Sequence, residues 1–451
     1  MADTIAAIAT GPVRSAIGIL RLSGPESVPA VSACFFPLSG RKLTDYPPGR
    51  LVLGTLRDEE GSVLDQCLAT YSRAPHSYTG EDTAEIQCHG SPAVLAAGLE
   101  TLFRRGVRQA GPGEFTRRAF LNGQLDLIQA EAVADLIDAQ TTDAARNAAG
   151  QLGRVMTRKI QTIADDLVDL LAHFHVVLDY PDEDIDPFRE EEIIQTLGRN
   201  ARALGLLRDS YRRGRQLTEG IPCAIVGRPN AGKSSLLNAL LGYDRAIVTN
   251  VPGTTRDTVE ERCVLGGVLL RLIDTAGLRE TEDLVERMGV ERSRAALAQA
   301  ELALVLLDGS QPLTAEDEAI LAEAAKCPHR LVLVSKSDLP HVLALPEELE
   351  WITISALTGQ GLDLLEESIR SRFARQLPRQ GEMLTNARQA EAVGRAAEAL
   401  QAAAEALECG LTPDAVLTDV EGALAALNEV TGKSVTEEVT RRIFQRFCVG
   451  K

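Results

Sequence analysis

The chain has 451 residues, 45% of them hydrophobic, and a formal net charge of −17. At roughly 150 residues per domain, this length predicts about three domains. The acidic balance excludes attraction of nucleic acid to the whole surface, because affinity for phosphates comes mainly from lysine and arginine. No apolar run approaches the roughly 18 residues of a membrane helix, and the N-terminus lacks signal-peptide features, so we expect a cytoplasmic protein without membrane contact.

Residues 1–118 have the pattern of a small α+β domain. The runs "DTIAAIAT" and "AIGILRLSG" are apolar and end at Gly or Pro, which is typical of short strands. The segment "LVLGTLRDEEGSVLDQCLATYSR" has the pattern of two strands around an acidic Gly turn.

Residues 119–215 change to a helical period. Apolar residues recur every three or four positions from Leu125 to Ala139 and again from Met156 to Val177. Helical periodicity returns within residues 378–451, where a capping-box pattern beginning at Ser434 predicts a last helix. We expect the two stretches to form one discontinuous helical domain.

Residues 216–377 alternate strand and helix patterns, which is typical of a parallel sheet covered by helices. The strand candidates are "IPCAIV", "LLRLID", "LALVLLD", "RLVLVS" and "WITIS". The predicted fold class is therefore multidomain α/β plus α, with a small α+β N-terminal domain and a Ras-like P-loop GTPase domain inserted into a helical domain.

A phosphate-binding loop is predicted at Gly227 to Ser235, "GRPNAGKSS", which fits G-x-x-x-x-G-K-[ST]. The motif follows an apolar strand and opens a helical run, as phosphate binding at a helix N-terminus requires. We expect Lys233 to reach the β- and γ-phosphates and Ser234 to bind Mg²⁺.

Four further motifs follow in the order of a GTPase. "GTTRD" from Gly253 supplies Thr255 to Mg²⁺, and "DTAG" from Asp274 faces the metal and the γ-phosphate. In "SKSD", Asp338 can accept two N–H bonds from guanine, and "SAL" from Ser355 offers a backbone N–H. The predicted GTP contacts are Asn230, Ala231, Gly232, Lys233, Ser234, Ser235, Thr249, Asn250, Val251, Pro252, Gly253, Thr254, Thr255, Asp274, Thr275, Ala276, Gly277, Lys336, Asp338, Ser355, Ala356 and Leu357.

Motifs outside the nucleotide site carry a family resemblance over almost the whole chain. They are "GILRLSG", "SYTGEDTAEIQCHG", "GPGEFTRRAFLNGQLDLIQAEAVADLIDA", "DYPDEDID" and the terminal "FCVGK". Together they make the sequence similar to the MnmE (TrmE) family of tRNA modification GTPases. The resemblance implies a homodimer formed through the N-terminal domain, a heterotetramer with an FAD-dependent MnmG partner, and modification of the wobble uridine of certain tRNAs.

The resemblance also implies a folate site. By position in the family, Arg21, Glu85, Gln124 and Lys451 would bind 5-formyl- or methylene-tetrahydrofolate, which carries the transferred carbon. The tail would bring Cys448 close to the reacting carbon. Gln124 departs from the family, whose members often carry a cation there.

Catalysis needs a residue that orients water, because Leu278 stands where Ras-like GTPases carry Gln. The resemblance implies that Glu286 takes this role. It further implies that K⁺ replaces an arginine finger, with ligand oxygens from Asn230, Thr249, Val251 and Thr254. A second departure is Ser335, which occupies the usual Asn position of the guanine motif and predicts weaker guanine affinity.

Two other function classes remain open from the residues. One is a GTP-dependent regulatory switch in ribosome assembly without base chemistry, although such proteins usually append a basic RNA-binding domain. The other is an unrelated P-loop ATPase, against which Asp338 argues. The segments "FRRGVR", "TRR" and "YRRGR" are either local RNA-binding patches or ordinary solvated arginines.

Overall fold

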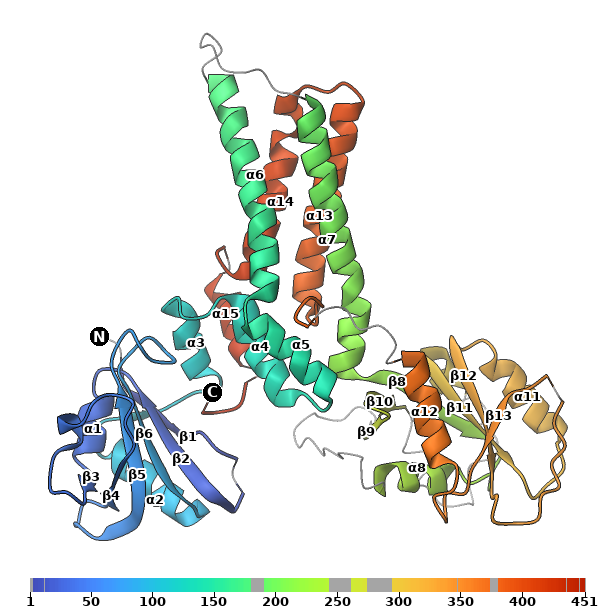
Figure 1. Cartoon of the computed structure of the whole chain (residues 1–451), viewed down its shortest axis with the longest axis horizontal. Helices are drawn as coiled ribbons and strands as arrows, with labels where there is room; N and C mark the ends of the chain where they lie inside the picture. Colours follow the sequence, from blue (N-terminus) through green and yellow to red (C-terminus); the bar gives the residue numbers. More distant parts are fainter. Residues whose placement is uncertain are drawn as a thin grey trace. The chain divides into compact units, whose positions relative to one another are not determined.

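The computed structural model describes residues 3–11, 13–179, 190–242, 261–273, 294–346, 348–373, 380–434, 436–445 and 447–450. The fold is multidomain α/β plus α, as predicted (Figure 1). The chain divides into two compact units. One comprises Met1–Ala134, Thr157–Ala172 and Glu421–Lys451, and the other comprises Asp135–Met156 and His173–Val420.

The first unit contains a seven-stranded sheet in the order β3-β4-β5-β6-β2-β1-β7. Neighbouring strands are antiparallel except for the parallel pair of β1 and β7. In this register Arg21 lies directly opposite Glu85. The strands are β1 Ile5–Ile8, β2 Ser15–Ser23, β3 Phe35–Pro37, β4 Val52–Arg57, β5 Val63–Ser72, β6 Thr83–Gly90 and β7 Arg108–Gln109.

Helix α2 (Pro92–Phe103) packs on β1, β2, β5 and β6. The alternation of the strands turns Leu20, Leu22 and Ile86 into this core, where each is fully buried. The other short helices near the sheet are α1 Ser27–Ser32, the 3-10 helix η1 Leu43–Asp45 and α3 Glu114–Leu121. Four further helices lie wholly or partly in this unit: α4 Leu127–Asp138, α6 Val155–Asp179, α14 Pro413–Thr431 and α15 Glu437–Phe444.

The last helix is present, but its predicted cap is wrong. Thr436, not Ser434, is the N-cap of α15, and its hydroxyl accepts the backbone N–H of Val439 at 3.5 Å. Both residue types cap helices well, so sequence spacing alone could not decide between them.

In the second unit, α7 (Glu190–Glu219) and α13 (Ala387–Glu408) pack along each other. Helix α5 (Thr142–Leu152) holds the chain that leads into α13. The buried Asn147 and Gln151 both donate to the carbonyl of Met383, at 3.2 and 2.6 Å. These bonds satisfy a buried backbone carbonyl and fix the entry to α13.

The second unit also holds a six-stranded sheet in the order β13-β12-β11-β8-β10-β9. The five strands that the sequence predicts pair in parallel, as expected, but the sequence analysis missed the edge strand β9, which runs antiparallel to β10. Gly266 and Gly267 both have positive φ, 62° and 77°, and form the two-residue hairpin that reverses the chain. The strands are β8 Ile221–Gly227, β9 Glu261–Leu265, β10 Val268–Leu272, β11 Leu302–Asp308, β12 His329–Ser335 and β13 Trp351–Thr353.

Helices cover both faces of this sheet. Helices α8 (Lys233–Gly242) and α12 (Leu362–Phe373) pack on the face of Cys223 and Ile225. Helix α11 (Ala315–Ala324) packs on the opposite face, with Ala224 and Val226. Among the described residues, the helices are too short or too polar to span a membrane.

Candidate functional site

The predicted phosphate loop connects the end of β8 at Gly227 to the first residue of α8, Lys233. Asn230 and Gly232 both have left-handed backbone conformations, with φ of 61° and 96°. Gly adopts this conformation without a steric penalty, and Asn tolerates it better than most residues. The loop therefore has the strand–loop–helix geometry of an anion-binding site.

The Lys233 ammonium lies over this loop. Its Nζ donates to the carbonyls of Gly227 at 2.7 Å and Arg228 at 2.6 Å. Burial lowers the pKa of Lys233, and the charge of Glu316 only partly opposes this. A phosphate group in the loop would supply the negative charge that a desolvated ammonium lacks. Lys233 thus fits its predicted role.

An ion pair anchors the loop to the opposite face of the sheet. Arg228 Nε lies 2.9 Å from the carboxylate of Asp317, which is almost fully buried at the start of α11. Asp317 also accepts the N–H and the hydroxyl of Thr314, the N-cap of α11. Sequence reasoning missed both members of this pair, because Asp317 belongs to no nucleotide motif.

Ser335 braces the same loop despite its short side chain. Its buried hydroxyl lies 2.6 Å from the carbonyl of Ala231 and 3.1 Å from that of Leu307. With one proton, the hydroxyl donates to either carbonyl. The link between the guanine motif and the phosphate loop therefore exists with Ser in the position of the usual Asn.

The neighbouring Lys336 makes an ion pair at the end of β11. Its Nζ lies 2.6 Å from Asp308 Oδ2. Burial raises the pKa of the Asp308 carboxyl, but hydrogen bonds from Lys336 and Ser310 outweigh this and hold the pKa below its ordinary value. The pair fixes the start of the SKSD loop in a left-handed conformation, with φ of 59° at Lys336.

Asp338, the predicted partner of guanine, is exposed at the end of this loop. One carboxylate oxygen accepts the hydroxyl of the buried Ser355 at 2.6 Å. The N–H of Ser355 donates to the carbonyl of Gln360, so it is already used within the protein. Ser355 orients Asp338, and Ala356 and Leu357 follow as the remaining predicted backbone contacts.

Several predicted residues lie outside the described residues: Thr249 to Thr255, Asp274 to Gly277, Glu286 and Lys451. They include the predicted second Mg²⁺ ligand, three predicted K⁺ ligands, the DTAG motif, the Glu predicted to orient water and the predicted terminal folate contact. The described part of the nucleotide site therefore consists of the phosphate loop with its Ser234 and Ser235, the SKSD loop and the SAL loop.

The predicted folate residues Arg21 and Glu85 meet on adjacent strands. Arg21 Nε donates to Glu85 Oε1 at 2.8 Å, and about a quarter of each side chain is exposed. The Arg21 guanidinium also lies 5.9 Å from the ring centre of Tyr78 and 6.0 Å from that of Phe115. A carboxylate, a guanidinium and aromatic rings suit a pterin and its anionic glutamate tail. Sequence reasoning missed both rings, although both lie within motifs of the family.

Gln124 lies near the same loop as Tyr78. A Cβ atom on Gly80 would come within 3.1 Å of Gln124 Nε2, and Gly80 has a φ of 74°. In the structure, Arg21, Glu85 and Gln124 therefore lie close to the loop of residues 77–82. We call Arg21, Tyr78, Glu85, Phe115 and Gln124 the predicted folate site.

The C-terminal tail is docked onto the first unit. The N–H of Gly113 donates to the carbonyl of Cys448 at 3.2 Å, and Val449 forms a β-bridge with Pro112. Gly450 lies so close to β1 that a Cβ atom there would come within 2.4 Å of the carbonyl of Ile8. Two residues after Gly113, Phe115 faces Arg21. The tail therefore lies against the segment that leads to Phe115, and Cys448 is exposed.

The basic segments are largely neutralised by the chain itself. Five of their arginines pair with carboxylates: Arg104, Arg108, Arg118, Arg212 and Arg215. These pairs favour the interpretation of ordinary paired arginines over RNA-binding patches.

Comparisons with known proteins agree with the motifs. The MnmE helical domain matches residues 127–448, and the GTP-binding protein TrmE N-terminus matches residues 4–124. The tRNA modification GTPase MnmE of Heliobacterium modesticaldum is 44% identical over 464 residues, which cover 100% of this chain and 99% of the relative. That of Thermus thermophilus is 44% identical over 451 residues, with the same coverage.

Among solved structures, Era of Aquifex aeolicus bound to GDP and AlF4⁻ is 28% identical and covers 39% of this chain and 65% of Era. Its TM-score of 0.25 carries no argument about the fold. The relatives, by contrast, match this chain from end to end at more than two-fifths identity. This chain belongs to the MnmE family of tRNA modification GTPases.

Proposed function

We propose that this protein is a K⁺-activated GTPase that works in the cytoplasm with an FAD-dependent MnmG partner. The pair adds a (carboxymethyl)aminomethyl group to the wobble uridine of certain tRNAs. The observation that carries the proposal is the docked tail: the carbonyl of Cys448 accepts the N–H of Gly113, two residues before Phe115, whose ring centre lies 6.0 Å from the Arg21 guanidinium. A GTP switch without base chemistry has no use for this arrangement.

In the GTPase half of the proposal, the phosphate loop and Lys233 bind the phosphates. Ser234, at the N-terminus of α8, and Thr255 hold Mg²⁺, whose charge stabilises the phosphate oxygens. Asp338 selects guanine, and Glu286 orients the attacking water. The Arg228–Asp317 pair and Ser335 keep the loop in place without touching the nucleotide.

In the folate half, tetrahydrofolate supplies the carbon that is transferred. Glu85 accepts N–H bonds from the pterin, Tyr78 offers a ring face, and Arg21, Gln124 and Lys451 bind polar groups of the cofactor. Phe115 is fully buried and packs near the Arg21 guanidinium instead of facing the cofactor. Only Lys451 lies outside the described residues. The residues present therefore fit a planar, polar ring with an anionic tail.

A homodimer through the predicted N-terminal domain, residues 1–118, is part of the proposal. Apolar side chains are exposed at the β3–β4 end of its sheet, among them Phe36, Leu38 and Leu53. Exposed apolar side chains that cluster at one edge are typical of a protein interface.

The direct test is nucleoside analysis of tRNA from cells that lack this protein. The modified wobble uridine should disappear and return when the intact gene is supplied. A Lys233→Ala gene, which removes phosphate binding, should fail to restore it. Unchanged tRNA nucleosides, together with accumulated ribosome precursors, would instead favour a regulatory switch in ribosome assembly.

Potassium dependence is tested at Asn230, the described member of the proposed K⁺ ligands. Exchanging KCl for NaCl should lower the GTPase rate by at least about tenfold, because K⁺ replaces an arginine finger worth roughly 10³ to 10⁵ in rate. Asn230→Ala should remove most of this cation response in a steady-state GTPase assay.

The control for that variant concerns the backbone. Asn230 has a φ of 61°, which strains Ala but not Gly. Asn230→Gly should therefore keep nucleotide affinity while losing the K⁺ response, and Asn230→Asp should retain an oxygen ligand. A Gly variant that responds fully to K⁺ would exclude the side-chain oxygen as a ligand.

A further inference from the structure

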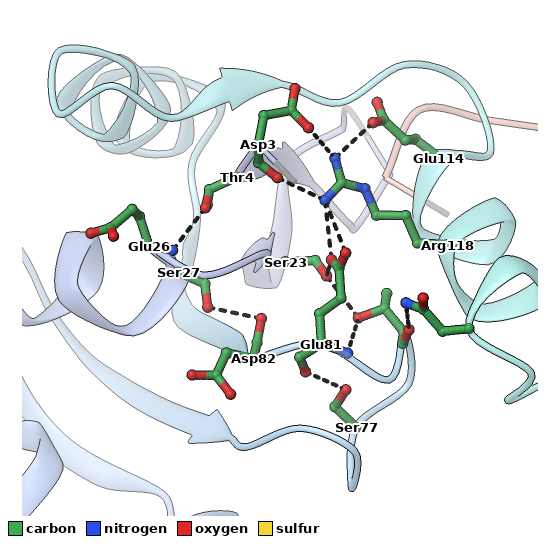
Figure 2. A network of polar contacts seen from close by, with 12 residues as sticks. Asp3, Thr4, Ser23, Glu26, Ser27, Ser77, Glu81, Asp82, Glu114 and Arg118 are labelled. Atoms are coloured by element: carbon green, nitrogen blue, oxygen red, sulfur yellow. Dashed lines mark hydrogen bonds and ion pairs between the residues drawn. The ribbon is translucent and has the colours of Figure 1, made fainter. Parts of the chain in front are cut away.

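A polar cluster in the first unit is centred on Arg118, whose side chain is only 11% exposed (Figure 2). Its guanidinium meets three carboxylates, those of Asp3, Glu81 and Glu114. These residues come from three separate segments: the residues before β1, the loop of residues 77–82 and helix α3. We call Arg118 and these three partners the Arg118 cluster.

The contacts of Arg118 are close and directional. Its Nη2 lies 2.7 Å from Asp3 Oδ1 and 3.0 Å from Glu114 Oε1, and its Nη1 lies 3.0 Å from Glu81 Oε2. Nη1 also donates to the backbone carbonyl of Asp3 at 2.8 Å. A planar guanidinium with five N–H donors can satisfy several acceptors at once, and a lysine cannot reproduce this geometry.

Glu81 connects Arg118 to the other residues of the loop through hydrogen bonds. Its carboxylate accepts the hydroxyl of the fully buried Ser23 at 2.7 Å, and Ser23 shares a second hydrogen bond with Thr79 at 2.7 Å. Asn122, just after α3, donates to the carbonyl of Thr79 at 2.7 Å. The loop is therefore tied to the end of β2 on one side and to α3 on the other (Figure 2).

The two elements that Arg118 joins are those that surround Arg21. The loop supplies Tyr78, whose hydroxyl shares a hydrogen bond with Thr116 of α3 at 3.0 Å. Helix α3 supplies the buried Phe115, and the turn after it leads to Gln124 beside Gly80. A shift between loop and helix would separate the two rings that face the Arg21 guanidinium.

We infer that Arg118 is a positioning residue of the folate site, which sets the spacing between loop 77–82 and α3 without touching the ligand. This inference rests on the proposed folate function. The motifs "SYTGED" and "TRRAFLNG" thereby acquire a joint role, since Glu81 belongs to the first and Arg118 to the second.

The test compares Arg118→Gln with Arg108→Gln in the full chain. Arg108 is the matched control because it contacts the same Asp3 and Glu114, yet its side chain is 49% exposed. Arg118→Gln should weaken binding of 5-formyl-tetrahydrofolate, measured by calorimetry, at least about tenfold. Arg108→Gln should bind within about twofold of the wild type, and both should keep wild-type GTP hydrolysis.

Amide hydrogen exchange of residues 77–82 without ligand provides the second readout. It should be faster in Arg118→Gln and unchanged in Arg108→Gln. If Arg118→Gln does not fold, Arg118→Lys takes its place, and it should show intermediate folate affinity and faster exchange.

A folded Arg118 variant with wild-type folate affinity and wild-type loop exchange overturns the inference. A wild-type protein that does not bind folate contradicts the proposed function instead. In that case, faster exchange of loop 77–82 in Arg118→Gln but not in Arg108→Gln still supports the positioning role. Equal exchange in the two variants overturns it.

Discussion

The Asp338→Asn protein is expected to prefer XTP to GTP. A carboxylate accepts two N–H bonds from guanine, whereas an amide offers one acceptor and one donor, which matches xanthine. Loss of a charge-assisted pair costs about 3 kcal/mol, so GTP affinity should fall about 100-fold. The amide oxygen can still accept the hydroxyl of Ser355, so the loop should keep its conformation. Competition binding with both nucleotides measures the change.

Asp308→Asn is the matched control for this reversal. Asp308 lies in the same region and pairs with Lys336 at 2.6 Å, but it is buried at the end of β11. Its replacement should weaken GTP and XTP binding alike, without reversing the preference. An Asp338→Asn protein that still selects GTP would show that another residue reads the base.

Deletion of Cys448 to Lys451 is expected to abolish tRNA modification while GTP hydrolysis continues. The deletion removes the bridge between Val449 and Pro112 and the contact of Gly450 with Ile8, so the segment that leads to Phe115 of the proposed folate site loses the tail that packs against it. The aromatic contacts that anchor α15 remain, because Phe444 lies 6.2 Å from Phe120 and 5.4 Å from Phe447 between ring centres. Nucleoside analysis of tRNA and a GTPase assay on the same preparation measure the two activities.

Point variants then separate the thiol from the docked backbone. Cys448→Ala keeps the carbonyl that Gly113 binds, and it should lose modification only if the thiol takes part. Cys409→Ala, at the other exposed cysteine, should modify tRNA normally. Loss of GTPase activity together with modification in the deletion would mean that the tail serves the fold alone.

The local sequence was sufficient to predict most of the helices and strands and the phosphate loop. Apolar periodicity predicted the strands of both sheets other than β6, β9 and the short β3 and β7. It also predicted the long helices α6, α13 and α14, but not α7. The phosphate loop was readable because its chemistry depends on consecutive residues: a strand, a turn through Asn230 and Gly232, and a helix N-terminus. The Leu-Gly-Gly-Val hairpin at Gly266 was equally local, and its two glycines were the signal that was overlooked.

Pairing between distant segments was decided only by the tertiary structure. Asp317 lies 89 positions from Arg228, and Ser335 lies 104 positions from Ala231. Neither spacing has a sequence signature, since the sheet order determines which loops meet. For the same reason the sequence could not show that Ser335 reaches the phosphate loop. The cap of α15 was a local ambiguity instead, because Ser434 and Thr436 are both of residue types that cap helices well.

The folate site shows both what the sequence predicted and what depended on tertiary packing. By resemblance the sequence named Arg21, Glu85 and Gln124. It did not reveal that Tyr78 and Phe115 face Arg21, that Arg118 sits among three carboxylates, or that the tail docks on Gly113. These contacts join residues up to several hundred positions apart in the sequence. Such contacts form only when packing of the folded chain brings the two segments together.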